Sequence, residues 1–182
     1  MIDNIYYRFK FQILITIFVG KIMYIMDKED LNKQVEQAVD NFKSGYNCSQ
    51  SVFSAFADIY GVDKNTALLL SSSFGGGIGR MRLTCGAACG MFMLAGLREG
   101  TATPKDIDGK NRIIKLVQDL AATFKQQNGS ISCAELLGLT SMKQRKASSE
   151  SLAKNNDKSN TCTKAVESAA RIWADYLRDK GE

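Results

Sequence analysis

Apolar residues recur at helical spacing along most of the chain, and no stretch alternates regularly between apolar and polar positions. The sequence contains one proline, and it has no signal for a β-hairpin. We therefore expect an all-α fold, a single-domain bundle of five to seven helices. The expected helices cover about 28–43, 48–60, 64–70, 85–97, 104–127, 133–137 and 162–179.

Capping signals set most of these boundaries. Asn47 precedes the second helix with Gln50 in the capping-box position, and Asp63 is placed to cap the third. Thr103-Pro104 is typical of a helix start, because proline suits the first helical position. Ser132 to Glu135 also reads as a capping box. We expect a mostly irregular polar segment over 139–160, within which the charged stretch 143–158 is a solvated loop.

Four of the five cysteines directly follow a residue type that favours helix N-caps. This pattern predicts that each of these thiols occupies the first position of a helix. The helix dipole favours negative charge there, so we expect lowered thiol pKa values. The four pairs are Asn47-Cys48, Thr84-Cys85, Ser132-Cys133 and Thr161-Cys162.

Residues 1–25 form an extension to the predicted all-α domain at 26–182. Its apolar run at 13–20 follows two basic residues, but Lys21 interrupts it, and the stretch 11–26 is short for a membrane span. One interpretation is an over-extended start, with the functional protein beginning at Met26. The other is a weak hydrophobic anchor that associates the chain with a membrane.

The charge and the residue types exclude several functions. The formal net charge of +5 is too small an excess to indicate nucleic-acid binding. The chain has no histidine, which excludes Ser-His-Asp and Cys-His catalysis and every histidine-containing metal site. Five cysteines, an odd number, in 182 residues fit a reducing compartment, so we expect a cytoplasmic protein.

The segment 74–79, Phe-Gly-Gly-Gly-Ile-Gly, leads into the fourth expected helix. It is interpreted either as a tight turn that needs positive φ angles or as a loop that cradles an anion. Arg80 and Arg82 follow it, and their charge would favour a thiolate at Cys85. Gly86 and Gly90 share one helix face, which suits internal packing or a homo-oligomer interface.

Thr84-Cys85-Gly86-Ala87-Ala88-Cys89-Gly90 contains Cys-Gly-Ala-x-x-Gly, and it follows Gly-Gly-Gly-Ile-Gly-Arg-Met. With Cys48 upstream and two single cysteines downstream, the chain resembles, over about 31–173, the redox-active proteins named for their C-GCAxxG-C-C pattern. The resemblance implies a redox role but no substrate. It makes Cys48, Cys85, Cys133 and Cys162 the family cysteines and Gly86, Ala87 and Gly90 the motif positions, which are candidates for cofactor binding. Cys89 lies at an x position.

Three functions remain open. In the first, a thiol-based oxidoreductase, Cys48 and Cys85 attack or are oxidised and Cys133 or Cys162 resolves the intermediate, with an unidentified redox partner. In the second, the four family cysteines, with Cys89 as a further ligand, hold Zn²⁺, Cu(I) or an iron–sulfur cluster. In the third, buried cysteines belong to a structural or interaction bundle without chemistry.

Overall fold

The computed structural model describes residues 28–139 and 156–180, and in these ranges the chain is an all-α bundle of seven α-helices without a strand. The expected fold class is confirmed. Two short 3-10 turns, η1 (Ala57–Tyr60) and η2 (Ser72–Phe74), join the helices. The helices are α2 (Lys28–Lys43), α3 (Cys48–Phe56), α4 (Lys64–Ser71), α5 (Gly86–Glu99), α6 (Ile107–Asn128), α7 (Cys133–Leu136) and α10 (Asn156–Asp179).

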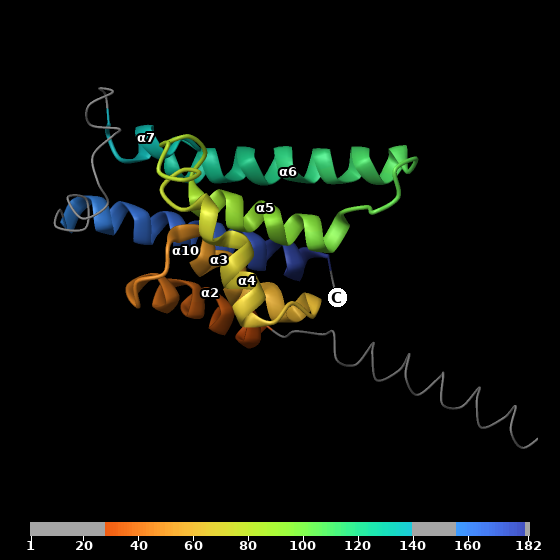
Figure 1. Ribbon diagram of the computed structural model, residues 1–182, viewed down its shortest axis with the longest axis horizontal. Coiled ribbons are helices and arrows are strands. Elements are labelled where there is room, and N and C mark those ends of the chain that lie inside the picture. The colour runs from red at the N-terminus through yellow and green to blue at the C-terminus, as the bar shows by residue number, and fades with distance from the viewer. Residues whose placement is uncertain (1–27, 140–155, 181–182) are drawn as a thin grey trace, which may run out of the picture.

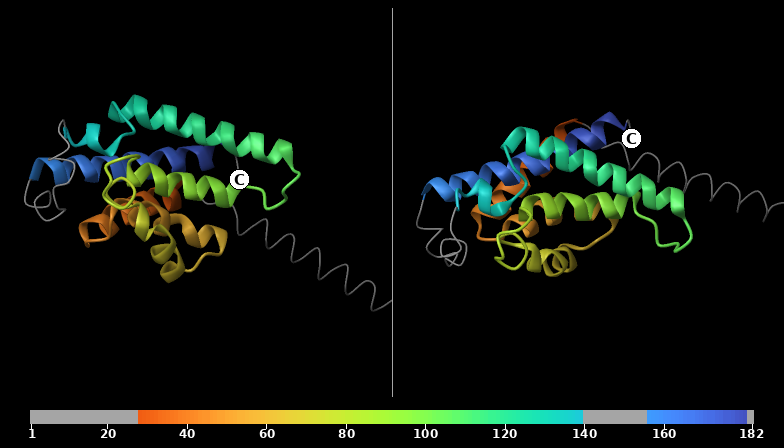
Figure 2. Two further views of the ribbon diagram at one scale, coloured as in Figure 1. Left: turned by 45° about the horizontal axis from the view of Figure 1, so that its top comes forward. Right: turned by 90° about the horizontal axis from the view of Figure 1, so that it is seen from above.

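The centre of the bundle is formed by α2, α3, α5 and α10, which pack against one another (Figure 1). The long helix α6 runs along α5 and α10, while α4 packs against α3 (Figure 2). The apolar faces predicted from helical spacing meet in one core. Its largest fully buried side chains are Trp173, Phe53, Phe56, Phe124, Met91 and Leu94.

The predicted caps of α3 and α4 are confirmed. Asn47 accepts hydrogen bonds from the amides of Ser49 and Gln50, and the Gln50 side chain accepts one from the Asn47 amide. Asp63 accepts a hydrogen bond from the amide of Thr66 at 3.1 Å. Both helices therefore begin where their side chains can satisfy amides that have no partner within the helix.

Two predicted helix starts are wrong by three residues or more. Helix α6 begins at Ile107 rather than beside Pro104, because Asp106 supplies the cap by accepting a hydrogen bond from Gly109. Helix α10 begins at Asn156, so the last part of the expected polar loop is helical and Cys162 lies within the helix. Polar side chains are compatible with an exposed helical turn, and Ser159 and Asn160 are both exposed.

Several predictions concern residues outside those the structure describes. They are the status of the extension 1–25, the membrane association of 11–26 and most of the loop at 143–158. Among the described helices, none combines the length and the apolar character needed to cross a bilayer.

Candidate thiol site

Helix α7, the Gly-rich loop and the start of α10 come together at one end of the bundle (Figure 1). Residues of these segments line a cavity of about 630 Å³. Four cysteines from four separate parts of the chain line it. They are Cys48 of α3, Cys85 directly before α5, Cys133 of α7 and Cys162 of α10. The fold therefore gathers the family cysteines around one space, as shared thiol chemistry requires. Cys89 is buried and is not among the lining residues.

Cys48 approaches the beginning of α5 because residue 86 has no side chain. A methyl group at Gly86 would lie 2.7 Å from Cys48 Sγ and 2.8 Å from the carbonyl oxygen of Phe74. Both separations are too short for a real contact. Glycine at this motif position thus lets the sulfur of Cys48 sit against the residue that follows Cys85.

Cys85 and Cys133 are held by the main chain rather than by their side chains. Thr84 and Ser132 form an isolated antiparallel bridge. Beside it, the Cys85 amide donates to the carbonyl of Ile131 at 2.8 Å, and the Cys133 amide donates to that of Leu83 at 2.6 Å. These bonds fix the two cysteines at the same wall of the cavity, although they lie far apart in the sequence.

The Gly-rich loop has an unusual backbone. Positive φ angles occur at Gly76, Gly77 and Gly79, which confirms the tight-turn interpretation, and also at three non-glycine residues. These are Ile78, Arg80 and Arg82. Each such residue costs about 1 kcal/mol or more. Every amide from 78 to 83 donates to a carbonyl between 73 and 78, which compensates for this cost and leaves those amides engaged within the loop.

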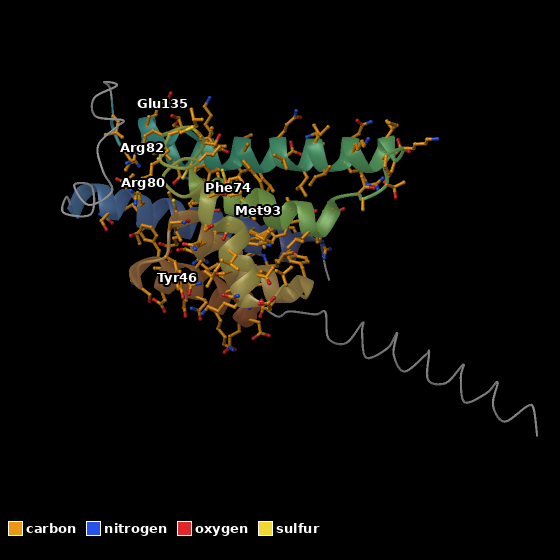
Figure 3. The ribbon with its side chains drawn as sticks, in the orientation of Figure 1. Tyr46, Phe74, Arg80, Arg82, Met93 and Glu135 are labelled. Atoms are coloured by element: carbon orange, nitrogen blue, oxygen red, sulfur yellow. The ribbon has the colours of Figure 1, made fainter. Side chains whose placement is uncertain are left out.

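The loop places one arginine inside the protein. Arg82 is only 3% exposed, and its Nη1 donates to Cys133 Sγ at 4.0 Å. We expected the arginine charges to act on Cys85, but the hydrogen bond is made to Cys133. A methyl group at Gly77 would lie 2.6 Å from the Cβ of Cys133, so this second glycine allows the loop to close over Cys133. Figure 3 shows Arg80, Arg82 and Glu135 together at this end of the molecule.

The expectation of lowered thiol pKa values is wrong for three of the four cysteines for which it was made, Cys85, Cys133 and Cys162. Burial raises the pKa of Cys85 far above its ordinary range, although the amides of Ala87 and Ala88 oppose this. Burial also raises the pKa of Cys89 to about 11 and that of Cys162 to about 12. For Cys133 burial again raises the pKa, and the hydrogen bond from Arg82 works against it. Desolvation therefore outweighs helix amides at this site.

The helix positions explain part of this result. Cys48 and Cys133 are the first residues of α3 and α7, as predicted. Cys85 is instead the N-cap residue of α5, and its side chain makes no capping hydrogen bond. Cys162 lies within α10, where the dipole of a helix end is remote.

The motif residues Gly86, Ala87 and Gly90 belong to α5, and none of them lines the cavity. The two glycines pack against α3. A methyl group at Gly90 would lie 2.8 Å from the carbonyl oxygen of Ser49, so this glycine lets the two helices pack closely. Ala87 is completely buried. The small-residue face considered for an oligomer interface is therefore occupied by α3 within the same molecule.

All five cysteines are free thiols. Among the residues at 28–139 and 156–180, no group of three or more Cys, Asp or Glu side chains is arranged to hold a metal ion. The four cysteines that line the cavity do not form such a group.

Comparison with known proteins relates most of the chain to a family. The family model described as "Putative redox-active protein (C_GCAxxG_C_C)" matches residues 46–176, which include all of the cysteines and every described lining residue of the cavity except Phe42 and Gly45. No curated protein matches the chain, and no solved structure does.

Proposed function

The chain belongs to the C_GCAxxG_C_C family, and we propose that it is a thiol-based oxidoreductase that exchanges disulfides within its cysteine-lined cavity. One observation carries the proposal. The sulfur of Cys48 lies so close to Gly86 that no side chain fits there, and Cys85 is the neighbouring residue. The proposed pair is therefore Cys48, which attacks the substrate, and Cys85, which resolves the intermediate.

Cys48 suits the attacking role because it is half-buried and faces the cavity, whereas Cys85 is buried. Ionisation of Cys48 also influences the whole cluster. Burial is the largest cause of the raised pKa values of Cys85, Cys89 and Cys162, and the negative charge of Cys48 is the second largest. The same charge contributes to the raised pKa of Cys133. A charge on Cys133 acts on Cys85, Cys89 and Cys162 in the same direction, so these thiols lie close enough to influence one another.

The reaction transfers two electrons. The Cys48 thiolate attacks one sulfur of a substrate disulfide, whose S–S bond breaks and releases one thiolate. Cys85 then gives up its proton and attacks the Cys48 sulfur of the mixed disulfide, which releases the second thiolate. The protein thiols are oxidised to a disulfide, the substrate is reduced to two thiols, and these take up the two protons lost by Cys48 and Cys85. An external dithiol restores the reduced protein.

Disulfide mapping combined with two variants tests this proposal. Reduced protein would be treated with 2-hydroxyethyl disulfide, and the remaining thiols and new disulfides would be identified by mass spectrometry. We expect the loss of two thiols and a Cys48–Cys85 disulfide. Cys48→Ser should slow the reaction at least about a hundredfold, because the nucleophile is lost.

Cys89→Ser is the matched control, since Cys89 is a buried cysteine of α5 that does not line the cavity. It should retain most of the rate. A disulfide between Cys48 and Cys133 would reassign the resolving residue, and an unchanged rate in Cys48→Ser would end the proposal.

A further inference from the structure

We propose that the preferred substrate is an anionic low-molecular-weight disulfide, one whose thiol halves carry carboxylates. The inference rests on the proposed function and adds a substrate class to it. Two arginines, Arg80 and Arg82, line the cavity, and none of the described lining residues is Asp, Glu or Lys. The thiols therefore share their space with the exposed guanidinium of Arg80 and with the buried side chain of Arg82.

The loop backbone holds both arginines at the cavity. Arg80 and Arg82 each have a positive φ, and the amides of both donate to carbonyls of the loop. The stem of Arg80 lies over Gly76, where an added methyl group would be 2.9 Å from its Cγ. Glycine at 76 thus makes room for Arg80. Backbone hydrogen bonds therefore position the loop so that Arg80 lines the cavity, and a guanidinium can bind a carboxylate through two parallel hydrogen bonds.

The two arginines occupy different depths. Arg82 is buried and donates to Cys133 Sγ, while Arg80 is exposed and lines the cavity from the outer side. A carboxylate entering the cavity would meet Arg80. A departing thiolate inside would lie near the charge of Arg82. Positive charge at both depths favours an anion during binding and also while negative charge develops on the leaving sulfur.

The size and the remaining lining fit a small polar molecule. A volume of about 630 Å³ lies within the range of about 300–1,000 Å³ of small-ligand pockets. Hydroxyl groups complement the arginines, and other lining side chains are apolar. The hydroxyl-bearing residues are Tyr46, Ser72, Ser73, Ser159 and Thr161, and the apolar ones include Phe42, Leu136 and Leu137.

Three disulfides that differ in charge test the inference. They are 3,3′-dithiodipropionate, which is anionic, 2-hydroxyethyl disulfide, which is neutral, and cystamine, which is cationic. The rate with each would be divided by its rate with free dithiothreitol, so that intrinsic reactivity cancels. We expect the anionic disulfide to be preferred about tenfold over the neutral one at low salt, with the preference falling as salt is added.

Arg80→Asn should remove most of this preference, because asparagine tolerates a positive φ but carries no charge. Arg112→Gln is the matched control. It removes one exposed positive charge from α6 outside the cavity lining, and it should leave the preference for the anionic disulfide unchanged. Circular dichroism would show that both variants are folded.

The outcomes separate the inference from the proposed function. Equal normalised rates for all three disulfides, in a reaction that still depends on Cys48, would overturn the anionic preference and leave the oxidoreductase intact. A preference for cystamine, or an Arg80→Asn variant that keeps the anionic preference, would overturn it as well. If no disulfide reacted through Cys48, the proposed function would fail, and the substrate class with it.

Discussion

The two ends of helix α10 are built in opposite ways. Trp173, near its C-terminal end, is completely buried, and its ring lies 5.0 Å from that of Tyr176 and 6.4 Å from that of Tyr60. Cys162, near its N-terminal end, lines an open cavity beside a small apolar cluster separate from the main core. The first end is held by buried apolar surface, and the second by loop hydrogen bonds and permissive glycines.

This difference indicates how stability and chemistry are divided. Cavity walls cannot supply the dense packing that stabilises a core, so the thiol site must be supported from elsewhere. The main core extends over α2, α3, α5, α6 and α10 and includes Cys85 and Met91. We infer that the packed end carries most of the stability and that the cavity end is free to keep its thiols accessible.

Trp173→Ala is the strongest test of that division. Removing a completely buried indole leaves a large hole and should reduce the free energy of unfolding by about 3–5 kcal/mol. Urea unfolding followed by circular dichroism would measure it. Under conditions where the variant is folded, its rate of disulfide exchange should match that of the wild type.

Trp173→Phe provides a finer comparison. The indole nitrogen of Trp173 is buried and has no hydrogen-bond partner among the described residues. Replacing the indole by a smaller apolar ring should therefore cost clearly less than replacing it by alanine. Equal losses for the two variants, or a slower exchange reaction in folded Trp173→Ala, would contradict the separation of the two ends.

Cys89 is buried in α5 outside the cavity lining, and its titration should be visible in the free energy of unfolding. Burial raises its pKa to about 11 from an ordinary value of 9.0. The folded protein therefore holds the proton more tightly than the unfolded chain. The resulting stability is present in full below pH 9 and is lost between about pH 9 and pH 11, at about 1.4 kcal/mol per pH unit.

The measurement is urea unfolding of reduced protein at several pH values, for the wild type and for Cys89→Ala. Tyrosines and lysines also titrate in this range, but they are common to both proteins and cancel in the difference. The wild type should lose stability more steeply than the variant above pH 9. Parallel curves would show that Cys89 is not a desolvated thiol.

Two glycines of α5 provide the smallest and most local test. Gly86→Ala forces a methyl group against Cys48 Sγ and the Phe74 carbonyl, so it should destabilise by about 1–3 kcal/mol. It should also displace Cys48 and slow disulfide exchange. Gly96 is exposed and has no atom within 4 Å of an added methyl group. Gly96→Ala should stabilise by about 0.5–1 kcal/mol.

Unfolding curves and exchange rates of both variants would be compared with those of the wild type. If Gly86→Ala reacted as fast as the wild type, the contact between Cys48 and the start of α5 would not control the chemistry. A loss of stability in Gly96→Ala would show that strain in α5 is not confined to the cavity end.

The sequence predicted the packed end well because it depends on local signals. Apolar spacing located the buried faces of α2, α3 and α10, and the caps at Asn47 and Asp63 gave correct helix starts. The start of α6 was mistaken because a proline signal competed with the aspartate cap three residues before Gly109. Each of these features is determined within a few positions along the chain.

The cavity end was predicted only in part. The cysteine pattern identified the four cysteines that line the cavity. No local sequence signal reveals which of their sulfur atoms lie next to one another. The positive φ angles of Ile78, Arg80 and Arg82 depend on the closure of the whole loop. The raised thiol pKa values arise from desolvation by distant segments, whereas the cap pattern reports only nearby amides.

The short bridge between Thr84 and Ser132 also limits what the intervening chain can do. Helices α5 and α6 lie between these two residues in the sequence, so the chain segment that contains them begins and ends at the bridge. Lengthening or shortening α6 by whole turns away from the junction would alter the shape of the molecule without changing the spacing of Cys85 and Cys133. The positions of Cys85 and Cys133 therefore do not depend on the length of α6.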